Sequence, residues 1–161
     1  MLAAINLHSI LVFIHVTAAV VGLGATFALA LAFPLAIRLG EPRYFPYVHL
    51  ISLEVTRKLA SPALAVILIT GIWQSIDGDF SMGDPWISAT FVIVIVLGGL
   101  QGAYFTKTDR KLAKLAEDEL AGGATKLSDS YMRQANREGA IGALAGLLIV
   151  AALFLMVTKP G

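Results

Sequence analysis

The chain contains no cysteine, and only 14% of its 161 residues are charged. The absence of cysteine excludes disulfide bonds, thiolate-ligated metals, iron–sulfur clusters and cysteine nucleophiles. A soluble domain of this length would carry about 25% charged residues. The net charge of +1 also gives no electrostatic reason to expect nucleic acid as a partner. The composition therefore indicates neither a soluble domain nor a nucleic-acid-binding protein.

Hydrophobic residues make up 57% of the chain and are concentrated in long blocks, with a mean hydropathy of +0.79. The four blocks cover residues 7–37, 59–76, 85–105 and 139–157. A helix of about 20 apolar residues crosses a hydrocarbon core of roughly 30 Å. We therefore predict an all-α polytopic membrane protein. Its single domain, residues 1–161, would be a four-transmembrane-helix bundle surrounded by the lipid bilayer.

Prolines mark several predicted helix limits. Pro34 is expected to kink or end the first helix. Ser61-Pro62 and Asp84-Pro85 are typical of the first turn of a helix, here the second and third. The N-terminal segment lacks the basic region and the cleavage site of a signal peptide, so the first block is predicted to remain as a membrane anchor.

Eleven of the twelve Lys and Arg residues lie in two connections, residues 38–58 and 106–138. The connection at 77–84 contains three aspartates and no basic residue. Cytoplasmic loops carry the excess of Lys and Arg in membrane proteins. We therefore predict a multi-pass protein of the cell membrane with both termini outside the cytoplasm.

The second basic connection is predicted to form a helical cytoplasmic hairpin. Leu112, Leu115, Ala116 and Leu120 recur at helical spacing, and Gly122-Gly123 interrupts the run. The hairpin is either a solvated extension of the third helix or a docking surface for a partner.

Small residues at four-residue spacing predict close helix packing, because lipid offers no hydrophobic driving force between helices. The pattern occurs at Ala18, Gly22 and Thr26, at Gly98 with Gly102, at Gly99 with Ala103, and at Gly142 with Gly146. These contacts would lie within one chain, in a homo-oligomer or in a larger membrane complex.

No Asp, Glu, Lys or Arg lies inside the four hydrophobic blocks, which disfavours a pump or coupled transporter, and His15 is the ionisable residue placed well within a span. It is either a structural histidine paired with a hydroxyl or carbonyl, or a metal ligand to haem or porphyrin with Gly22 leaving room for the macrocycle. His8 lies about 10 Å away along the helix, so the two cannot bind one iron from opposite faces. His49 is predicted on the cytoplasmic side, away from His15.

The run from Arg57 to Ala63, followed by Gly71-Ile72-Trp73, resembles the second-helix pattern of HemJ-type protoporphyrinogen oxidases. Their group includes CopD-like domains and uncharacterised bacterial predicted four-helix integral membrane proteins, which the chain resembles most, over nearly its full length. The resemblance implies a haem- or porphyrin-linked role for His15. Thr90 and Gln101 stand where those oxidases carry lysine and tend to carry histidine, so the fold transfers and the activity does not.

The leading interpretation is an integral membrane protein with an accessory or structural role rather than a catalytic one. The alternatives are a haem- or porphyrin-binding protein with His15 as ligand, and a subunit or scaffold of a larger membrane complex.

Overall fold

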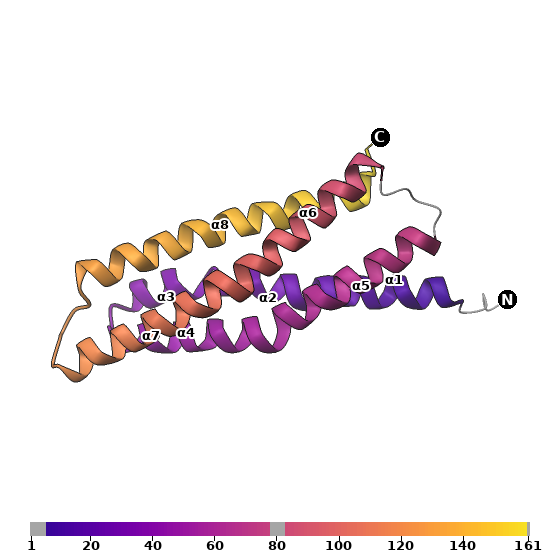
Figure 1. Cartoon of the computed structure of the whole chain (residues 1–161). Helices are drawn as coiled ribbons and strands as arrows, with labels where there is room; N and C mark the ends of the chain where they lie inside the picture. The colour runs from indigo at the N-terminus through magenta and orange to yellow at the C-terminus, as the bar shows by residue number, and fades with distance from the viewer. Residues whose placement is uncertain (1–5, 78–82, 161) are drawn as a thin grey trace.

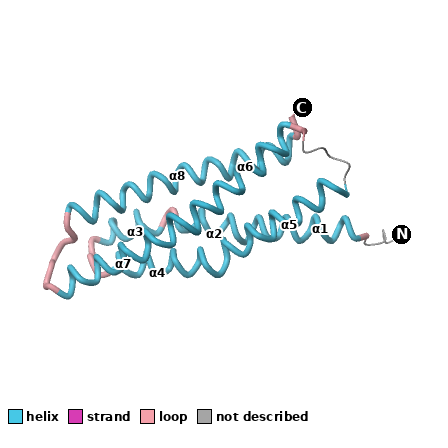
Figure 2. Tube along the Cα trace, in the orientation of Figure 1, coloured by secondary structure: helices cyan, strands magenta, loops and turns pink. Residues whose placement is uncertain are grey.

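The computed structural model describes residues 6–77 and 83–160, so most of the predicted loop between the second and third helices lies outside the described residues (Figure 1). Within the described residues, all regular structure is helical (Figure 2). Four helical segments of the described chain are long and apolar enough to cross a membrane: Leu7–Leu39, Tyr44–Asp77, Pro85–Ala121 and Asp129–Thr158. The predicted four-helix membrane bundle is confirmed.

Both ends of the described chain lie at one end of the bundle, here called the terminal end (Figure 1). The opposite end, here called the hairpin end, holds the turn between α3 and α4 and the connection between α7 and α8 (Figure 1). The first segment comprises α1 (Leu7–Ala18), the π-helical η1 (Ala19–Leu23), α2 (Gly24–Leu29) and α3 (Ala32–Leu39).

Pro34 interrupts the first segment as predicted. The helix breaks at residues 30–31, because a proline has no N–H to donate to the carbonyl four residues earlier, here that of Ala30. The segment ends at Gly40, whose φ of 72° is a left-handed conformation that glycine adopts readily.

The second segment comprises α4 (Tyr44–Val55), the π-helical η2 (Thr56–Ala60) and α5 (Ser61–Asp77). The helix therefore begins at Tyr44, and Pro62 lies inside it rather than at its start. The π-helical turn ends at Ala60, two residues before Pro62, whose missing N–H weakens the regular α-helical pattern. As a result, the residues from 44 to 58 extend the bundle instead of forming a loop.

The third segment comprises α6 (Pro85–Gly99), the π-helical η3 (Leu100–Phe105) and α7 (Thr106–Ala121), and the fourth is α8 (Asp129–Thr158). Asp84 precedes Pro85 at the start of α6, as predicted. The helix of α7 ends before Gly122, and Gly123 has a φ of 86°. The helical hairpin between the third and fourth segments is therefore confirmed.

The bundle contains two hydrophobic clusters. The first includes Leu23, Leu64, Ile67, Val94, Leu97 and Ile149. The second, toward the hairpin end, includes Ala36, Phe45, Leu112, Ala116, Tyr131 and Ala135. The second cluster arises because α3, α4, α7 and the start of α8 continue the bundle past the most apolar part of each segment.

The predicted patterns of small residues do not all form close contacts between helices. A Cβ on Gly22 would lie 2.1 Å from the Cβ of Ala63, so this glycine permits close contact between the first and second segments. In contrast, Gly98, Gly99 and Gly102 are exposed and have open space beside them. Only the first of these patterns therefore produces a tight contact within the chain.

Candidate metal centre

Three buried polar side chains meet between the two hydrophobic clusters. His49 comes from α4, Asp109 from α7 and Glu138 from α8. Their side chains are only 4%, 3% and 11% exposed, respectively. Burial of ionisable groups is costly unless they are paired or coordinate a metal, so this cluster requires a chemical explanation.

The three residues are close enough to share one ion. His49 Nδ1 lies 2.8 Å from Asp109 Oδ1 and 3.5 Å from Glu138 Oε2. One ligand atom from each residue lies within 4.8 Å of the others. Ligand atoms about 2.1 Å from a common ion, at octahedral or tetrahedral angles, are about 3.0 to 3.4 Å apart. The spacing therefore fits a coordination site.

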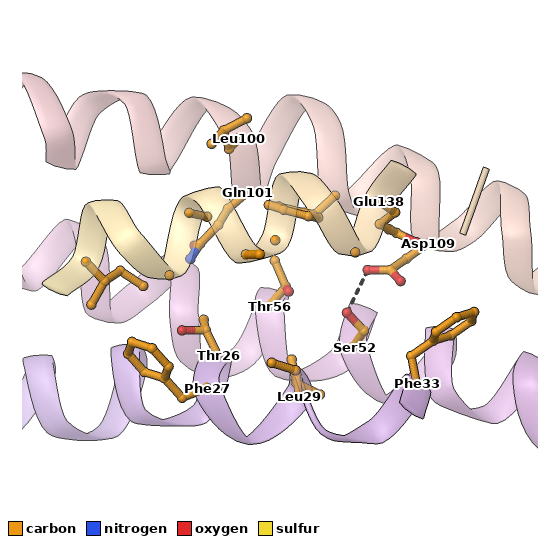
Figure 3. Close-up of a pocket in the computed structure, with 18 of the residues that line it drawn as sticks. Thr26, Phe27, Leu29, Phe33, Ser52, Thr56, Leu100, Gln101, Asp109 and Glu138 are labelled. Carbon is orange, nitrogen blue, oxygen red and sulfur yellow. Dashed lines mark hydrogen bonds between the residues drawn. The ribbon is translucent and has the colours of Figure 1, made fainter. Parts of the chain in front are cut away.

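Two hydroxyl groups orient the cluster. Tyr131 Oη lies 2.9 Å from His49 Nε2, and Ser52 Oγ donates to Asp109 Oδ2 at 2.8 Å, the bond drawn dashed in Figure 3. A histidine that ligates a metal through one nitrogen commonly donates the N–H of the other to an outer partner. Tyr131 is placed to accept that bond while His49 Nδ1 faces the two carboxylates.

One carboxylate oxygen of the cluster is unsatisfied. Glu138 Oε1 is buried and has no hydrogen-bond partner among the described residues. A buried hydrogen-bond acceptor without a partner loses its hydrogen bonds to water and gains none within the protein, which costs free energy. A cation at this position would supply the missing interaction.

The three polar residues point into the bundle because they lie on the buried, apolar faces of their helices. His49 lies four residues after Phe45 and four before Leu53, both buried. Asp109 is followed on its face by Leu112 and Ala116, and the spacings of three and four keep side chains on one side of a helix. Each polar residue is therefore turned inward by its apolar neighbours.

Glu138 follows the same rule on α8, where Tyr131 and Ala135 precede it on the buried face. None of the three residues was predicted to be a metal ligand, because all three lie outside the four hydrophobic blocks of the sequence. One sequence pattern could have identified them: a single His, Asp or Glu at helical spacing among apolar residues. The pattern occurs in the segments that continue those blocks.

A cavity of about 530 Å³, here called the Glu138 cavity, adjoins the cluster. Asp109, Glu138 and Ser52 lie at one end of this cavity, and Gln101, Thr26 and Phe27 lie at the other (Figure 3). Most of the remaining lining is aliphatic or aromatic. Sites for small molecules commonly have volumes of about 300 to 1,000 Å³ and a few polar groups in an apolar lining.

The two predicted site residues lie elsewhere and apart. His15 lines a second cavity of about 750 Å³, here called the His15 cavity, nearer the terminal end. Its Nδ1 lies 2.8 Å from Thr70 Oγ1, the type of pairing expected of a structural histidine. Gly22 is not among the residues that line this cavity and instead contacts Ala63.

The other two histidines are also placed separately. His8 Nδ1 pairs with Asp77 Oδ2 at 2.7 Å, joining α1 to the end of α5. His49 lies in the cluster with Asp109 and Glu138. Within the part of the chain that the structure describes, His49 is the one histidine brought together with two acidic side chains.

Residues 9–160 match the model of a protein family described as "Predicted integral membrane protein (DUF2269)". No curated protein and no solved structure matches the chain. The match includes nearly all of the first helical segment and the whole of the other three, with His49, Asp109 and Glu138. It supports a multi-pass protein in contact with the lipid bilayer.

Proposed function

We propose that this chain, which belongs to the DUF2269 family of integral membrane proteins, binds a divalent transition-metal ion between His49, Asp109 and Glu138. The observation that carries the proposal is the buried, unpartnered Oε1 of Glu138 beside an imidazole and a second carboxylate. An ion there would balance the buried negative charge and satisfy the remaining oxygen.

The ligand set favours certain ions. Imidazole nitrogen suits zinc, iron, copper and nickel, whereas carboxylate oxygen suits manganese, magnesium and calcium. A site with one nitrogen and two carboxylates therefore fits Zn²⁺, Mn²⁺ or Fe²⁺ best. Three protein ligands also leave at least one coordination position open, as in metal sites that bind an exogenous ligand.

The proposal is tested by titrating Zn²⁺ and Mn²⁺ into the full-length protein in lipid nanodiscs and measuring heat and stoichiometry. We expect one ion per chain in the wild type. Asp109→Asn and Glu138→Gln should each weaken binding by more than the roughly 10- to 100-fold loss typical of an outer-shell change. Asp129→Asn, an exposed acid at the start of α8, is the matched control and should bind normally.

Two results would contradict the proposal. The wild type could take up no ion, in which case the cluster only pairs the helices through hydrogen bonds. Alternatively, Asp109→Asn and Glu138→Gln could bind as tightly as Asp129→Asn, which would place the ion elsewhere.

A second candidate function is haem or porphyrin binding through His15, as the resemblance to HemJ-type oxidases implies. The Thr70 hydroxyl donates its one proton to the Val66 carbonyl at 2.6 Å, so it accepts a bond from His15 Nδ1–H. That tautomer leaves a lone pair on Nε2, which an iron requires. The His15 cavity supplies the space beside it, without a contribution from Gly22.

The porphyrin candidate predicts a Soret band in protein purified from cells supplied with haem precursors. The band should be lost in His15→Ala and retained in His8→Ala, which removes the other histidine that lines the same cavity. A spectrum without a Soret band, or one unchanged in His15→Ala, would contradict this candidate.

We also propose that the hairpin end faces the cytoplasm of the cell and that both termini are extracytoplasmic. The distribution of basic residues supports this orientation, since eleven of twelve lie in the two connections of the hairpin end and their flanks. An accessory role within a homo-oligomer or larger membrane complex stays a prediction.

A further inference from the structure

We propose that the Glu138 cavity binds a single-chain membrane amphiphile whose anionic oxygen headgroup ligates the metal ion. This inference rests on the proposed function, because the ion provides the attachment point for the headgroup. It extends that function by assigning a ligand class to the open coordination position.

The cavity is long enough to hold a molecule with an acyl or similar chain. Its lining residues on α8 run from Ala135 to Val150, which corresponds to about 22 Å of helix at 1.5 Å per residue. The volume of about 530 Å³ is therefore distributed along the bundle rather than gathered around the ion. An elongated space suits an acyl or similar chain better than a compact polar solute.

The cavity opens where the surrounding solvent is lipid. Among its lining residues, Leu147 and Val150 on α8 are 68% and 54% exposed. Both lie in the most apolar stretch of the fourth segment, residues 139–157. Phe27 on α2 is also exposed and forms part of the lining. An amphiphile already in the bilayer could thus enter sideways between α2 and α8.

The far end of the cavity is polar. Asp109 and Glu138 face it together with Ser52 (Figure 3). The π-helical segment η2 adds the buried Thr56 to the lining, whereas the buried Gln101 of η3 lies at the opposite end of the cavity (Figure 3). π-helical turns occur frequently at functional sites. The lining therefore combines an apolar wall with polar groups suited to an oxygen-bearing headgroup.

The charges of the residues that line the cavity determine which headgroup should bind. Among the described residues that line the Glu138 cavity there is no Lys or Arg, so without an ion an anionic headgroup would lie beside the carboxyl groups of Asp109 and Glu138 with no such cation to pair with. A divalent ion balances those carboxylates and offers its open position to an oxygen donor. The preference for an anionic headgroup should therefore depend on the metal.

The test uses a fatty acid with a photoreactive diazirine in its chain and the corresponding fatty amine, each in nanodiscs with full-length protein. With Zn²⁺ bound, we expect the fatty acid to label residues that line the cavity on α2 and α8, mapped by mass spectrometry. Chelation of the Zn²⁺ should reduce labelling by the acid several-fold. The amine should show the opposite dependence, since it is attracted only to the metal-free carboxylates.

A cavity-filling variant gives the matched control. Gly142 lines the cavity, and a Cβ there would first meet Phe105 Cε1 at 4.0 Å. Gly142→Phe should therefore fill the space and abolish labelling, whereas Gly99→Phe, on an exposed face with open space, should not. Ala143→Leu, also in the lining, is a smaller second variant. Each variant must retain Zn²⁺ binding, which reports an intact fold.

The outcomes separate the two proposals. If Zn²⁺ binds but labelling of the cavity is independent of the metal or headgroup, or survives both Gly142→Phe and Ala143→Leu, the amphiphile inference is overturned and the metal site remains. If the wild type binds neither Zn²⁺ nor Mn²⁺, both proposals fail.

Discussion

His49 is the residue on which the buried polar cluster depends. Its Nδ1 faces Asp109 and Glu138, and its Nε2 lies beside Tyr131 Oη. Both ring nitrogens are therefore engaged, which fixes the ring in one orientation. In metalloproteins, such outer partners set the tautomer and the direction of the ligating nitrogen.

Tyr131→Phe tests this outer partner. The substitution removes the hydroxyl that lies 2.9 Å from His49 Nε2 and leaves the three proposed ligands in place. We expect Zn²⁺ affinity to fall by roughly 10- to 100-fold with the stoichiometry unchanged. Tyr104→Phe is the control, since Tyr104 belongs to η3 and is not among the residues lining the cavity. Equal affinities in the two variants would show that Tyr131 does not orient a metal ligand.

Gly22→Ala tests the role of this glycine in packing. The added Cβ would lie 2.1 Å from the Ala63 Cβ, so the first and second segments must move apart. We expect destabilisation of about 1 to 3 kcal/mol, the usual cost of overpacking, measured as a lower thermal unfolding temperature in detergent. Gly24→Ala, with open space beside it, should be nearly neutral. An unchanged unfolding temperature in Gly22→Ala would contradict the packing role.

At the residue scale, the sequence identified His15 as a candidate ligand but assigned no such role to His49, Asp109 or Glu138. His15 is conspicuous because it interrupts an apolar block, and its pairing with a hydroxyl was one of the predicted alternatives. The other three residues lie in segments with many polar neighbours, and 60 residues separate His49 from Asp109. Their meeting depends on how α4, α7 and α8 pack, which no local pattern specifies.

At the scale of elements, the helices extend well past the hydrophobic blocks. The second helical segment starts at Tyr44 and the fourth at Asp129, whereas the corresponding blocks start at residues 59 and 139. Apolar length predicts where a helix crosses lipid, but a helix continues wherever its next residues can pack. Phe45, Leu53 and Tyr131 provide that packing in the second hydrophobic cluster and its surroundings.

The three π-helical segments also could not be predicted. They lie at residues 19–23, 56–60 and 100–105, one in each of the first three helical segments. Only the second is followed closely by a proline. Such turns arise where side-chain packing shifts the backbone register. Thr56 of the second segment and Gln101 of the third line the Glu138 cavity.

The orientation of the elements is tested with single cysteines, because the chain has none of its own. Ala124→Cys marks the connection between α7 and α8, and Thr158→Cys marks the end of α8. We expect a membrane-impermeant thiol reagent to label Thr158→Cys on intact cells. Ala124→Cys should react only after the membrane is permeabilised.

The reverse pattern would place the hairpin end outside the cell. The positive-inside prediction for this chain would then be wrong, and the ion site would lie toward the extracytoplasmic side. Labelling of both cysteines on intact cells would indicate damaged membranes, so a cytoplasmic marker protein is probed in the same sample as the control.

For the whole molecule, the sequence predicted the architecture well because membrane insertion depends on local hydrophobicity. Four apolar blocks produced four helical segments, and the predicted hairpin is present. Association between copies stays a prediction: Gly98, Gly99 and Gly102 lie on an exposed face, but their pattern alone identifies no partner. The cavities depend on the relative placement of all four segments and were therefore inaccessible to sequence reasoning.

Metal binding by this chain depends on the whole bundle, since α4, α7 and α8 must converge for an ion to bind. The most direct measurement is zinc X-ray absorption on the protein loaded with one equivalent of Zn²⁺. We predict a sulfur-free shell of nitrogen and oxygen at about 2.0 to 2.2 Å, with the multiple-scattering signature of one imidazole. That signature should disappear in His49→Ala and persist in His15→Ala and His8→Ala. An imidazole signal that survives His49→Ala, or no stoichiometric uptake by the wild type, would contradict the account.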